Sequence, residues 1–312
     1  MTKKISRRSF IKKSTTIGVG SLVAGNIITD LSVAASRQKV DVSVVQGKNY
    51  FDNTIKAVEQ LGGIQQFVPK NSKVAILANP QRNNPGAYTK PEVLKAAIHL
   101  CKKAGAKEIN CISWLPEQNW EGTGLKKVVD EEGTNLVITN LRDESLFKPV
   151  PVPKGKSLKE ARIIKTLFNN DLFIDLPITK DHAGNKFTGT LKNLMGLNSP
   201  KNNRGFHKPN WKTDINDIRH LDQCIADLNT IIKPALCIVD ATEFIITNGP
   251  FGPGKLHKPQ KVVAGTDRVA IDSYCCTLWG LEAKDIITIT SAYKHHLGEI
   301  DLKKLKIKEL KI

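Results

Sequence analysis

Residues 171–196 read DLFIDLPITKDHAGNKFTGTLKNLMG and join an apolar run to a segment rich in polar and basic side chains. The run 171–176 is typical of a strand that is buried on both faces of a sheet. The segment that follows it contains His182, Lys192 and Asn193 between glycines. In open α/β sheets, ligands bind beyond the carboxyl ends of the strands. We therefore expect a functional site here, although composition alone would also fit a solvated turn.

Predicted strands and helices alternate on both sides of this stretch. Further strands are expected at 40–45, 73–78, 107–112, 135–139, 236–239 and 261–264, and helices at 51–61, 90–104, 125–132, 157–169, 214–232 and 266–279. This alternation predicts an α/β fold with a largely parallel open sheet flanked by helices. The most apolar runs, 73–78, 171–176 and 236–239, should be central and mostly parallel strands.

The length of the chain leaves its domain organisation open. Residues 36–312 suit a single α/β domain, with two lobes, 36–150 and 151–312, as an alternative. The clearest interruption is KPVPVPKG at 148–155. Alternating prolines of this kind fit a crossover between lobes or an extended edge strand.

The amino terminus resembles an export signal. Residues 6–13 read SRRSFIKK, the pattern of a twin-arginine signal, and the weakly apolar stretch after it ends in Val-Ala-Ala at 33–35, which export peptidases cleave. Residues 1–35 are therefore the predicted signal peptide, with the twin-arginine translocase as partner and a periplasmic or extracellular destination. A spanning helix needs about 20 predominantly apolar residues, so we expect no stable membrane anchor in the mature chain.

The charge favours a small anionic ligand. The chain has a net charge of +17, and because residues 1–35 contribute +5 from six basic residues and Asp30, +12 remains. Aromatic residues make up 6% and no nucleic-acid-binding module is visible, so no nucleic-acid partner is expected. The six cysteines form no C-x-x-C pair and no iron–sulfur motif, and they are expected to be small buried side chains.

Three residues of the 171–196 segment are candidate catalytic residues. Lys192 suits a nucleophile or an anion clamp, because a desolvated lysine has a lowered pKa. Asn193 would orient a substrate carbonyl or cap a turn. His182 would act in catalysis or as a metal ligand. The alternatives are a lysine on a helix surface and a solvated histidine.

Other candidates would bind a metal or a cofactor. Imidazoles suit transition metals and carboxylates suit harder ions, so His182 and His207 with Asp240 or Glu243 would form a mixed metal site. A transition metal or a metal-containing cofactor is therefore a candidate. The predicted cofactor-binding residues, which offer a hydroxyl, close backbone approach or a guanidinium, are Thr188, Gly189, Gly249, Gly252 and Arg204.

The order of several motifs resembles the family called domain of unknown function 362 over nearly the whole chain after residue 35. The motifs are Asn79-Pro80, Thr89-Lys-Pro-Glu-Val, Leu176-Pro-Ile-Thr-Lys180-Asp-His182, Thr188-Gly-x-Leu-Lys192-Asn-Leu-Met-Gly196, Ile238-Val-Asp240, Gly249-Pro-x-Gly252-Pro and Gly265-Thr-Asp267-x-Val-Ala-x-Asp272. The family name implies no reaction. Its members are often fused or adjacent to ferredoxin-type clusters, for which this chain has no motif.

A local resemblance to the nickel-pincer lactate racemase family lies in His182, Lys192 and His207, with Gly189 and Gly196 around the lysine. This resemblance implies one pocket lined by a histidine, a cofactor-holding lysine and a second histidine. The sequence thus predicts an exported metal- or cofactor-dependent enzyme acting on a small anionic molecule. The alternative is a non-catalytic periplasmic ligand-binding or cofactor-accessory protein.

The export signal is testable by changing its two arginines. Replacing Arg7 and Arg8 by lysine should leave an uncleaved precursor in the cytoplasm, because the translocase reads the arginine pair. Cell fractionation and immunoblotting would measure precursor and mature protein. Undiminished export of the double variant would show that the twin-arginine assignment is wrong.

Overall fold

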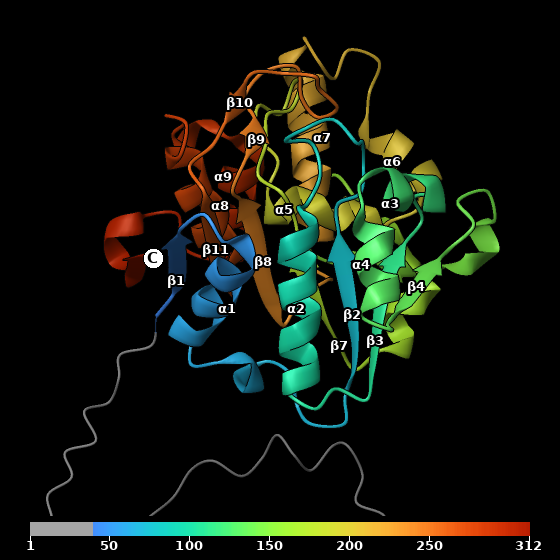
Figure 1. The fold of residues 1–312 in the computed structure, drawn as a ribbon. Coiled ribbons are helices and arrows are strands. Elements are labelled where there is room, and N and C mark those ends of the chain that lie inside the picture. The colour runs from blue at the N-terminus through green and yellow to red at the C-terminus, as the bar shows by residue number, and fades with distance from the viewer. Residues whose placement is uncertain (1–39) are drawn as a thin grey trace, which may run out of the picture. The chain divides into compact units, whose positions relative to one another are not determined.

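The computed structural model describes residues 40–312, which form one α/β unit around an eight-stranded sheet (Figure 1). The predicted signal peptide lies outside the described residues. The order across the sheet is β12 (Ile307–Lys311), β1 (Val42–Gln46), β11 (Lys261–Gly265), β8 (Leu236–Ala241), β7 (Leu172–Leu176), β2 (Lys73–Ala78), β3 (Glu108–Ser113) and β4 (Asn135–Ile138). Strands from both halves of the chain share this sheet.

The middle of the sheet is parallel. β8, β7, β2, β3 and β4 run in one direction, with Ile174 of β7 opposite Leu236 of β8 and Ile76 of β2. β11 is antiparallel to both β8 and β1, and β12 is parallel to β1. The predicted α/β class and the central, parallel position of the strands at 73–78, 171–176 and 236–239 are confirmed.

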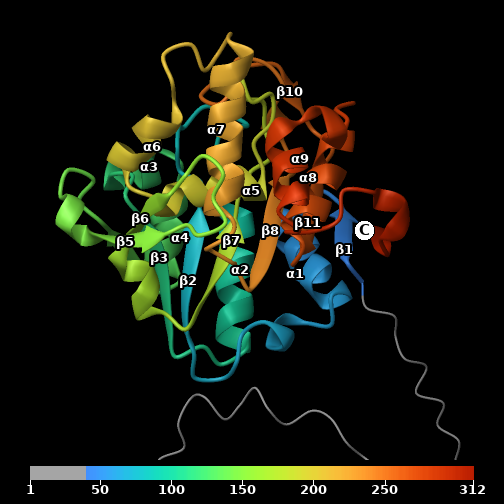
Figure 2. The same cartoon turned by 180° about the vertical axis from the view of Figure 1, so that it is seen from behind.

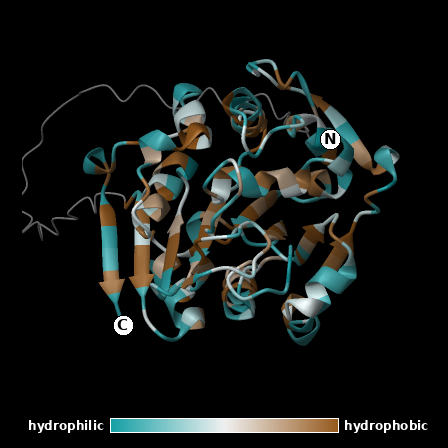
Figure 3. Cartoon of the chain, turned by 90° about the horizontal axis from the view of Figure 1, so that it is seen from above, coloured by the Kyte–Doolittle hydropathy of each residue, from teal (hydrophilic) through white to brown (hydrophobic). Residues whose placement is uncertain are grey.

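Helices cover both faces of the sheet. α1 (Tyr50–Gln60), α2 (Pro91–Lys103), α3 (Glu117–Gly122) and α4 (Leu125–Glu131) lie on one face (Figure 1), and α5 (Thr190–Asn193), α7 (Ile215–Leu228), α8 (Arg268–Thr277) and α9 (Ile287–Lys294) lie on the other (Figure 2). Two buried apolar clusters, one on each face, hold these layers to the sheet. Seen from above, hydrophobic residues concentrate between the layers (Figure 3).

Local sequence explains where the longer helices begin. Pro91 opens α2, where its missing N–H costs nothing. Asp214 caps α7 by accepting hydrogen bonds from the backbone N–H groups of Asn216 and Asp217. Asp267 caps α8 by accepting a hydrogen bond from the backbone N–H of Ala270. None of the helices in residues 40–312 is long and apolar enough to span a membrane.

The predicted helix at 157–169 is wrong. The segment forms β6 (Glu160–Ile164) and a 3-10 turn (Lys165–Asn169), and β6 pairs antiparallel with β5 (Phe147–Pro151), the proline-rich segment. Leu158, Ala161 and Ile164 are spaced three residues apart, which fits a helix, whereas the buried residues Ala161 and Ile163 alternate as in a strand. The pairing with β5 decides between the two. The proline-rich run is therefore an extended strand of a small hairpin.

Short elements complete the chain and position the loops above the sheet. They are α6 (Pro200–Phe206), β9 (Phe244–Ile245) and β10 (Leu256–His257). The six cysteines, all in the described part of the chain, are buried and unpaired. Their predicted role as small buried side chains is therefore confirmed.

A buried carboxylate on α8 holds the start of the short helix α5. Asp272 accepts hydrogen bonds from Thr190 N (2.7 Å), Thr190 Oγ1 (3.0 Å) and Leu191 N (3.0 Å). These backbone groups have no partner inside α5, as at any helix start. The approach is so close that a Cβ at Gly189 would lie 2.3 Å from Asp272 Oδ1. Gly189 is thus required by packing against Asp272.

Replacing Asp272 by alanine should lower the free energy of unfolding by about 3 kcal/mol, because buried N–H groups of α5 lose a charged acceptor. Urea denaturation followed by circular dichroism would measure the change. The control is Asp285→Ala at an exposed position, for which a change within about 0.5 kcal/mol is expected. Equal stabilities of the two variants would contradict the anchoring role of Asp272.

Candidate functional site

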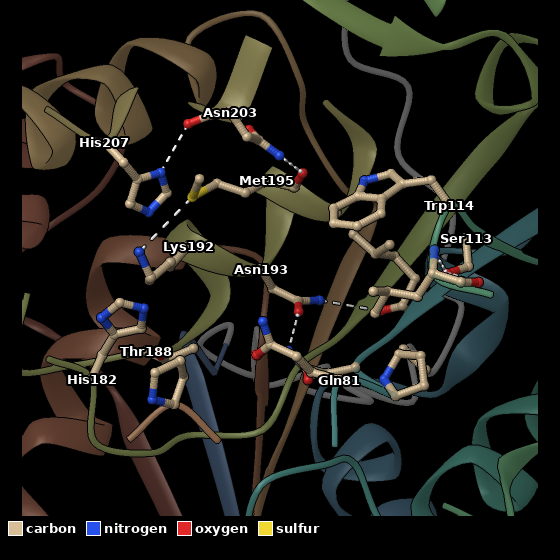
Figure 4. A pocket seen from close by; sticks show the side chains of 17 residues that line it. Gln81, Ser113, Trp114, His182, Thr188, Lys192, Asn193, Met195, Asn203 and His207 are labelled. Carbon is tan, nitrogen blue, oxygen red and sulfur yellow. Dashed lines mark hydrogen bonds between the residues drawn. The ribbon is translucent and has the colours of Figure 1, made fainter. Parts of the chain in front are cut away.

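A cavity of about 200 Å3 lies beyond the carboxyl ends of β2, β3 and β7 (Figure 4). One part of its wall is apolar and includes Leu77, Pro80, Trp114, Leu115, Met195 and Pro250. The other part is polar and includes His182, Thr188, Lys192, Asn193, Asn203 and His207. The structure thus brings together residues that the sequence placed between 182 and 207, at the sheet edge where ligands were expected.

Lys192 presents a buried amine to this cavity from α5. Its side chain is 9% exposed, and Nζ donates to Asn185 Oδ1 (3.1 Å) and lies 3.9 Å from Met195 Sδ. Within the described residues Lys192 forms no ion pair. Burial lowers the pKa of Lys192 to about 8, against the opposing charge of Asp222. An amine of this kind is partly neutral near physiological pH.

Two imidazoles flank this amine (Figure 4). The Nδ1 of His182 lies 2.6 Å from the carbonyl of Ala183, and that of His207 lies 2.9 Å from the carbonyl of Asn203. A carbonyl only accepts, so each Nδ1 carries the proton and each neutral ring keeps an Nε2 lone pair. Burial lowers the pKa of both histidines, and the Lys192 charge lowers them further. Trp211 contacts both rings.

Asn193 lines the cavity but binds mainly to the protein. Its Nδ2 donates to Asp175 Oδ1 (2.7 Å), and its Oδ1 accepts from Asn79 Nδ2 (3.0 Å). Asp175 belongs to β7 and Asn79 follows β2, so Asn193 cross-links two strand ends to α5. These contacts support a structural function for Asn193 rather than the predicted contact with a substrate carbonyl.

Lys180 was not among the predicted site residues. It is fully buried, and its Nζ donates to the carbonyl of Ala87 (2.6 Å) and, more weakly, to Gln81 Oε1 (3.3 Å) and Asn79 Oδ1 (3.4 Å). Burial, with repulsion from Lys192, lowers the pKa of Lys180 to about 7. Asn79 and Gln81 line the cavity. Their position directly after β2 was a signal for these residues, by the same rule that located His182.

The four residues proposed as a metal site are not assembled. Asp240 accepts hydrogen bonds from Lys90 N (2.7 Å), Thr242 N (2.9 Å) and Thr242 Oγ1 (2.6 Å), and Glu243 pairs with Lys90 and Lys258. Neither carboxylate lines the cavity that holds His182 and His207. In residues 40–312 no group of three or more His, Cys, Asp and Glu side chains could hold a metal ion.

Only some of the predicted cofactor-binding residues lie at the cavity. Thr188 lines the cavity and pairs through its backbone with Lys180, which closes the loop between them. Gly249 packs against the same loop, where a Cβ would lie 1.8 Å from the Asp181 carbonyl oxygen. Its neighbour Pro250 provides the contact with the cavity.

The remaining predicted cofactor-binding residues do not line the cavity. Gly189 packs against Asp272, as described above. Gly252 has a φ of +66°, which favours glycine for backbone reasons. Arg204 is exposed on α6. The structure thus places five predicted residues in the cavity lining, namely His182, Thr188, Lys192, Asn193 and His207, and places the other predicted residues outside it.

Comparison with known proteins places the chain in a family. Residues 73–277 match the model described as domain of unknown function (DUF362). A thylakoid-associated protein of Synechocystis sp. is 25% identical over 265 residues, which cover 80% of this chain and 78% of that protein. The lactate racemase apoprotein from Thermoanaerobacterium thermosaccharolyticum aligns with a TM-score of 0.44 and 16% identity, over 76% of this chain and 58% of that one. The family predicted from the motifs is thus confirmed: the chain belongs to the DUF362 family.

Proposed function

We propose that this protein is an exported enzyme that binds a small anionic carbonyl compound in the cavity and acts on it through Lys192. One observation carries the proposal: a buried lysine, with no ion pair to any residue of 40–312, shares the cavity with two imidazoles whose Nε2 atoms carry no proton. A buried lysine with a lowered pKa is the usual nucleophile toward carbonyl groups. Export follows from the arginine pair in the sequence and remains part of the proposal.

The size and charge of the cavity define the ligand class. An apolar cavity of about 150 Å3 accepts benzene, so the 200 Å3 available here suit a short organic acid. Lys192 lines the cavity with no carboxylate partner among residues 40–312, and the imidazoles of His182 and His207 add further basic groups to its wall. The buried amine of Lys180 lies behind this wall, bonded to the lining residues Asn79 and Gln81. A carboxylate on the ligand would supply the missing negative charge.

The side chains fit a reaction that begins with an imine. The neutral amine of Lys192 attacks the carbonyl carbon, and loss of water gives an imine between Lys192 and the substrate. Protonation of this imine nitrogen draws electrons from the neighbouring carbon and makes its proton acidic. The Nε2 of His182 or His207 then accepts that proton and returns it later. The reaction class is therefore proton transfer next to a carbonyl group.

A metal held by side chains alone does not fit this site, because the described residues bring two imidazoles and no carboxylate to the cavity. The resemblance to the nickel-pincer family implies instead a metal that arrives with ligands of its own on a cofactor. In that case Lys192 would hold the cofactor in place of forming an imine with the substrate, with His182 and His207 beside it. The bound cofactor would supply an electron acceptor for the substrate.

The proposal predicts that Lys192 is trapped by a small aldehyde acid. Incubation with glyoxylate and cyanoborohydride should add one carboxymethyl group to Lys192, measured by peptide mass spectrometry. Only the neutral amine reacts, so labelling should rise with pH through about 8, whereas an exposed lysine should require a pH near 10.

Two variants separate the possible roles of Lys192. Lys192→Arg keeps the positive charge but forms no imine, so it should bind the acid and lose trapping. The exposed Lys201→Ala should behave as the unaltered protein. Labelling of Lys192 no faster than that of surface lysines would refute the nucleophilic role. Tight binding of small acids without any conversion would favour the non-catalytic alternative.

A further inference from the structure

We propose that Asp222 on α7 is a positioning residue that acts through Asn185 to direct the amine of Lys192 into the cavity. The proposal deepens the proposed function and rests on it for its catalytic meaning. Asp222 does not touch the cavity itself. It was not among the residues singled out from the sequence.

A chain of buried hydrogen bonds connects the three residues. Asn185 Nδ2 and Thr288 Oγ1 both donate to Asp222 Oδ1, and Asn185 Oδ1 accepts from Lys192 Nζ (3.1 Å). Asn185, Asp222 and Thr288 are at most 3% exposed. Asp222 and Thr288 come from the packed helices α7 and α9, whereas Asn185 lies in the loop after β7. Rigid helices thus hold a residue of the loop.

The chemistry of Asp222 determines which way Asn185 points. An ionised carboxylate only accepts hydrogen bonds, so Asn185 must turn its NH2 group toward Asp222. Its carbonyl oxygen then faces Lys192. The reverse orientation would set oxygen against carboxylate and NH2 against the amine, leaving buried groups unpaired. Asp222 therefore imposes an acceptor on Lys192.

This acceptor restricts the Lys192 amine. A neutral amine has two N–H groups and one lone pair. One N–H is directed to Asn185 Oδ1, and Met195 Sδ at 3.9 Å is a weak acceptor for the other. The lone pair is left for the cavity, where a carbonyl carbon would be attacked. The chain of contacts thus orients the nucleophile before any ligand binds.

Because Asp222 and Asn185 also act on the charge of Lys192, their removal should change the pKa of Lys192 measurably. Among the described residues, His182, His207 and Lys180 are the basic groups that interact electrostatically with Lys192, and Asp222 is the acidic group. The Asp222 charge favours the protonated lysine and opposes the effect of burial. Removing this charge, or the Asn185 acceptor, should therefore make Lys192 lose its proton at a lower pH.

Competitive labelling with acetic anhydride tests the effect of Asp222 and Asn185 on Lys192 in the absence of any ligand. Mass spectrometry would follow acetylation of Lys192 against pH in the unaltered protein, in Asp222→Asn and in Asn185→Leu. The titration midpoint should fall by about one pH unit in each variant. The matched control is Asp285→Asn, an exposed position where no change is expected. Circular dichroism would verify that each variant is folded.

A midpoint that stays constant or rises in either folded variant would overturn the proposal. Glyoxylate trapping well above the midpoint then tests orientation, because Lys192 is neutral in every variant there. It should slow by about tenfold in both, and an unchanged rate would refute the positioning role. If the unaltered protein shows no trapping, the proposed function fails, whereas the acetylation midpoints still decide whether Asp222 controls Lys192.

Discussion

The burial of basic side chains that have no ion-pair partner in the described part of the chain is the constraint on which the site depends. A buried ammonium is costly in a medium of low polarity, and proteins usually reduce the cost with a paired carboxylate. Lys180 and Lys192 have neutral acceptors instead, a backbone carbonyl for the first and an asparagine oxygen for the second. Their pKa values of about 7 and 8 follow from this arrangement. Both amines can therefore gain or lose a proton near neutral pH.

The polar cross-links below the cavity explain how the fold tolerates this constraint. Lys180 donates to Asn79, Asn79 donates to Asn193, and Asn193 donates to Asp175. The donors all point in the same direction, from a basic end to an acidic end. This series of hydrogen bonds joins the loops after β2 and β7 to α5. Asp272 fixes the start of α5 from the other side. The position of Lys192 on α5 is thus set by residues from β7, from the loops after β2 and β7, and from α8.

The sequence was sufficient for the fold class and for the region of the site, for physical reasons. A short apolar run such as 73–78 favours a buried strand over a helix because of its length, and the carboxyl ends of parallel strands meet at one edge of the sheet. It was insufficient where local patterns are ambiguous, as at 157–169, where helix and strand periods both fit. It was also insufficient for Asp240, because a carboxylate after a strand can serve a ligand or a neighbouring loop. Here Lys90 and Thr242 use it.

The glycines and asparagines show why the role of a residue near the cavity could not be read from its type alone. Gly189 and Gly249 suggested close approach of a ligand, but the groups that approach are Asp272 and the Asp181 backbone. Asn193 suggested a substrate contact, but its amide is used between strands. Asn185 was not among the site residues predicted from the sequence, but its side chain accepts a hydrogen bond from Lys192. A residue type defines which hydrogen bonds are possible, and the tertiary packing decides between protein and ligand as the partner.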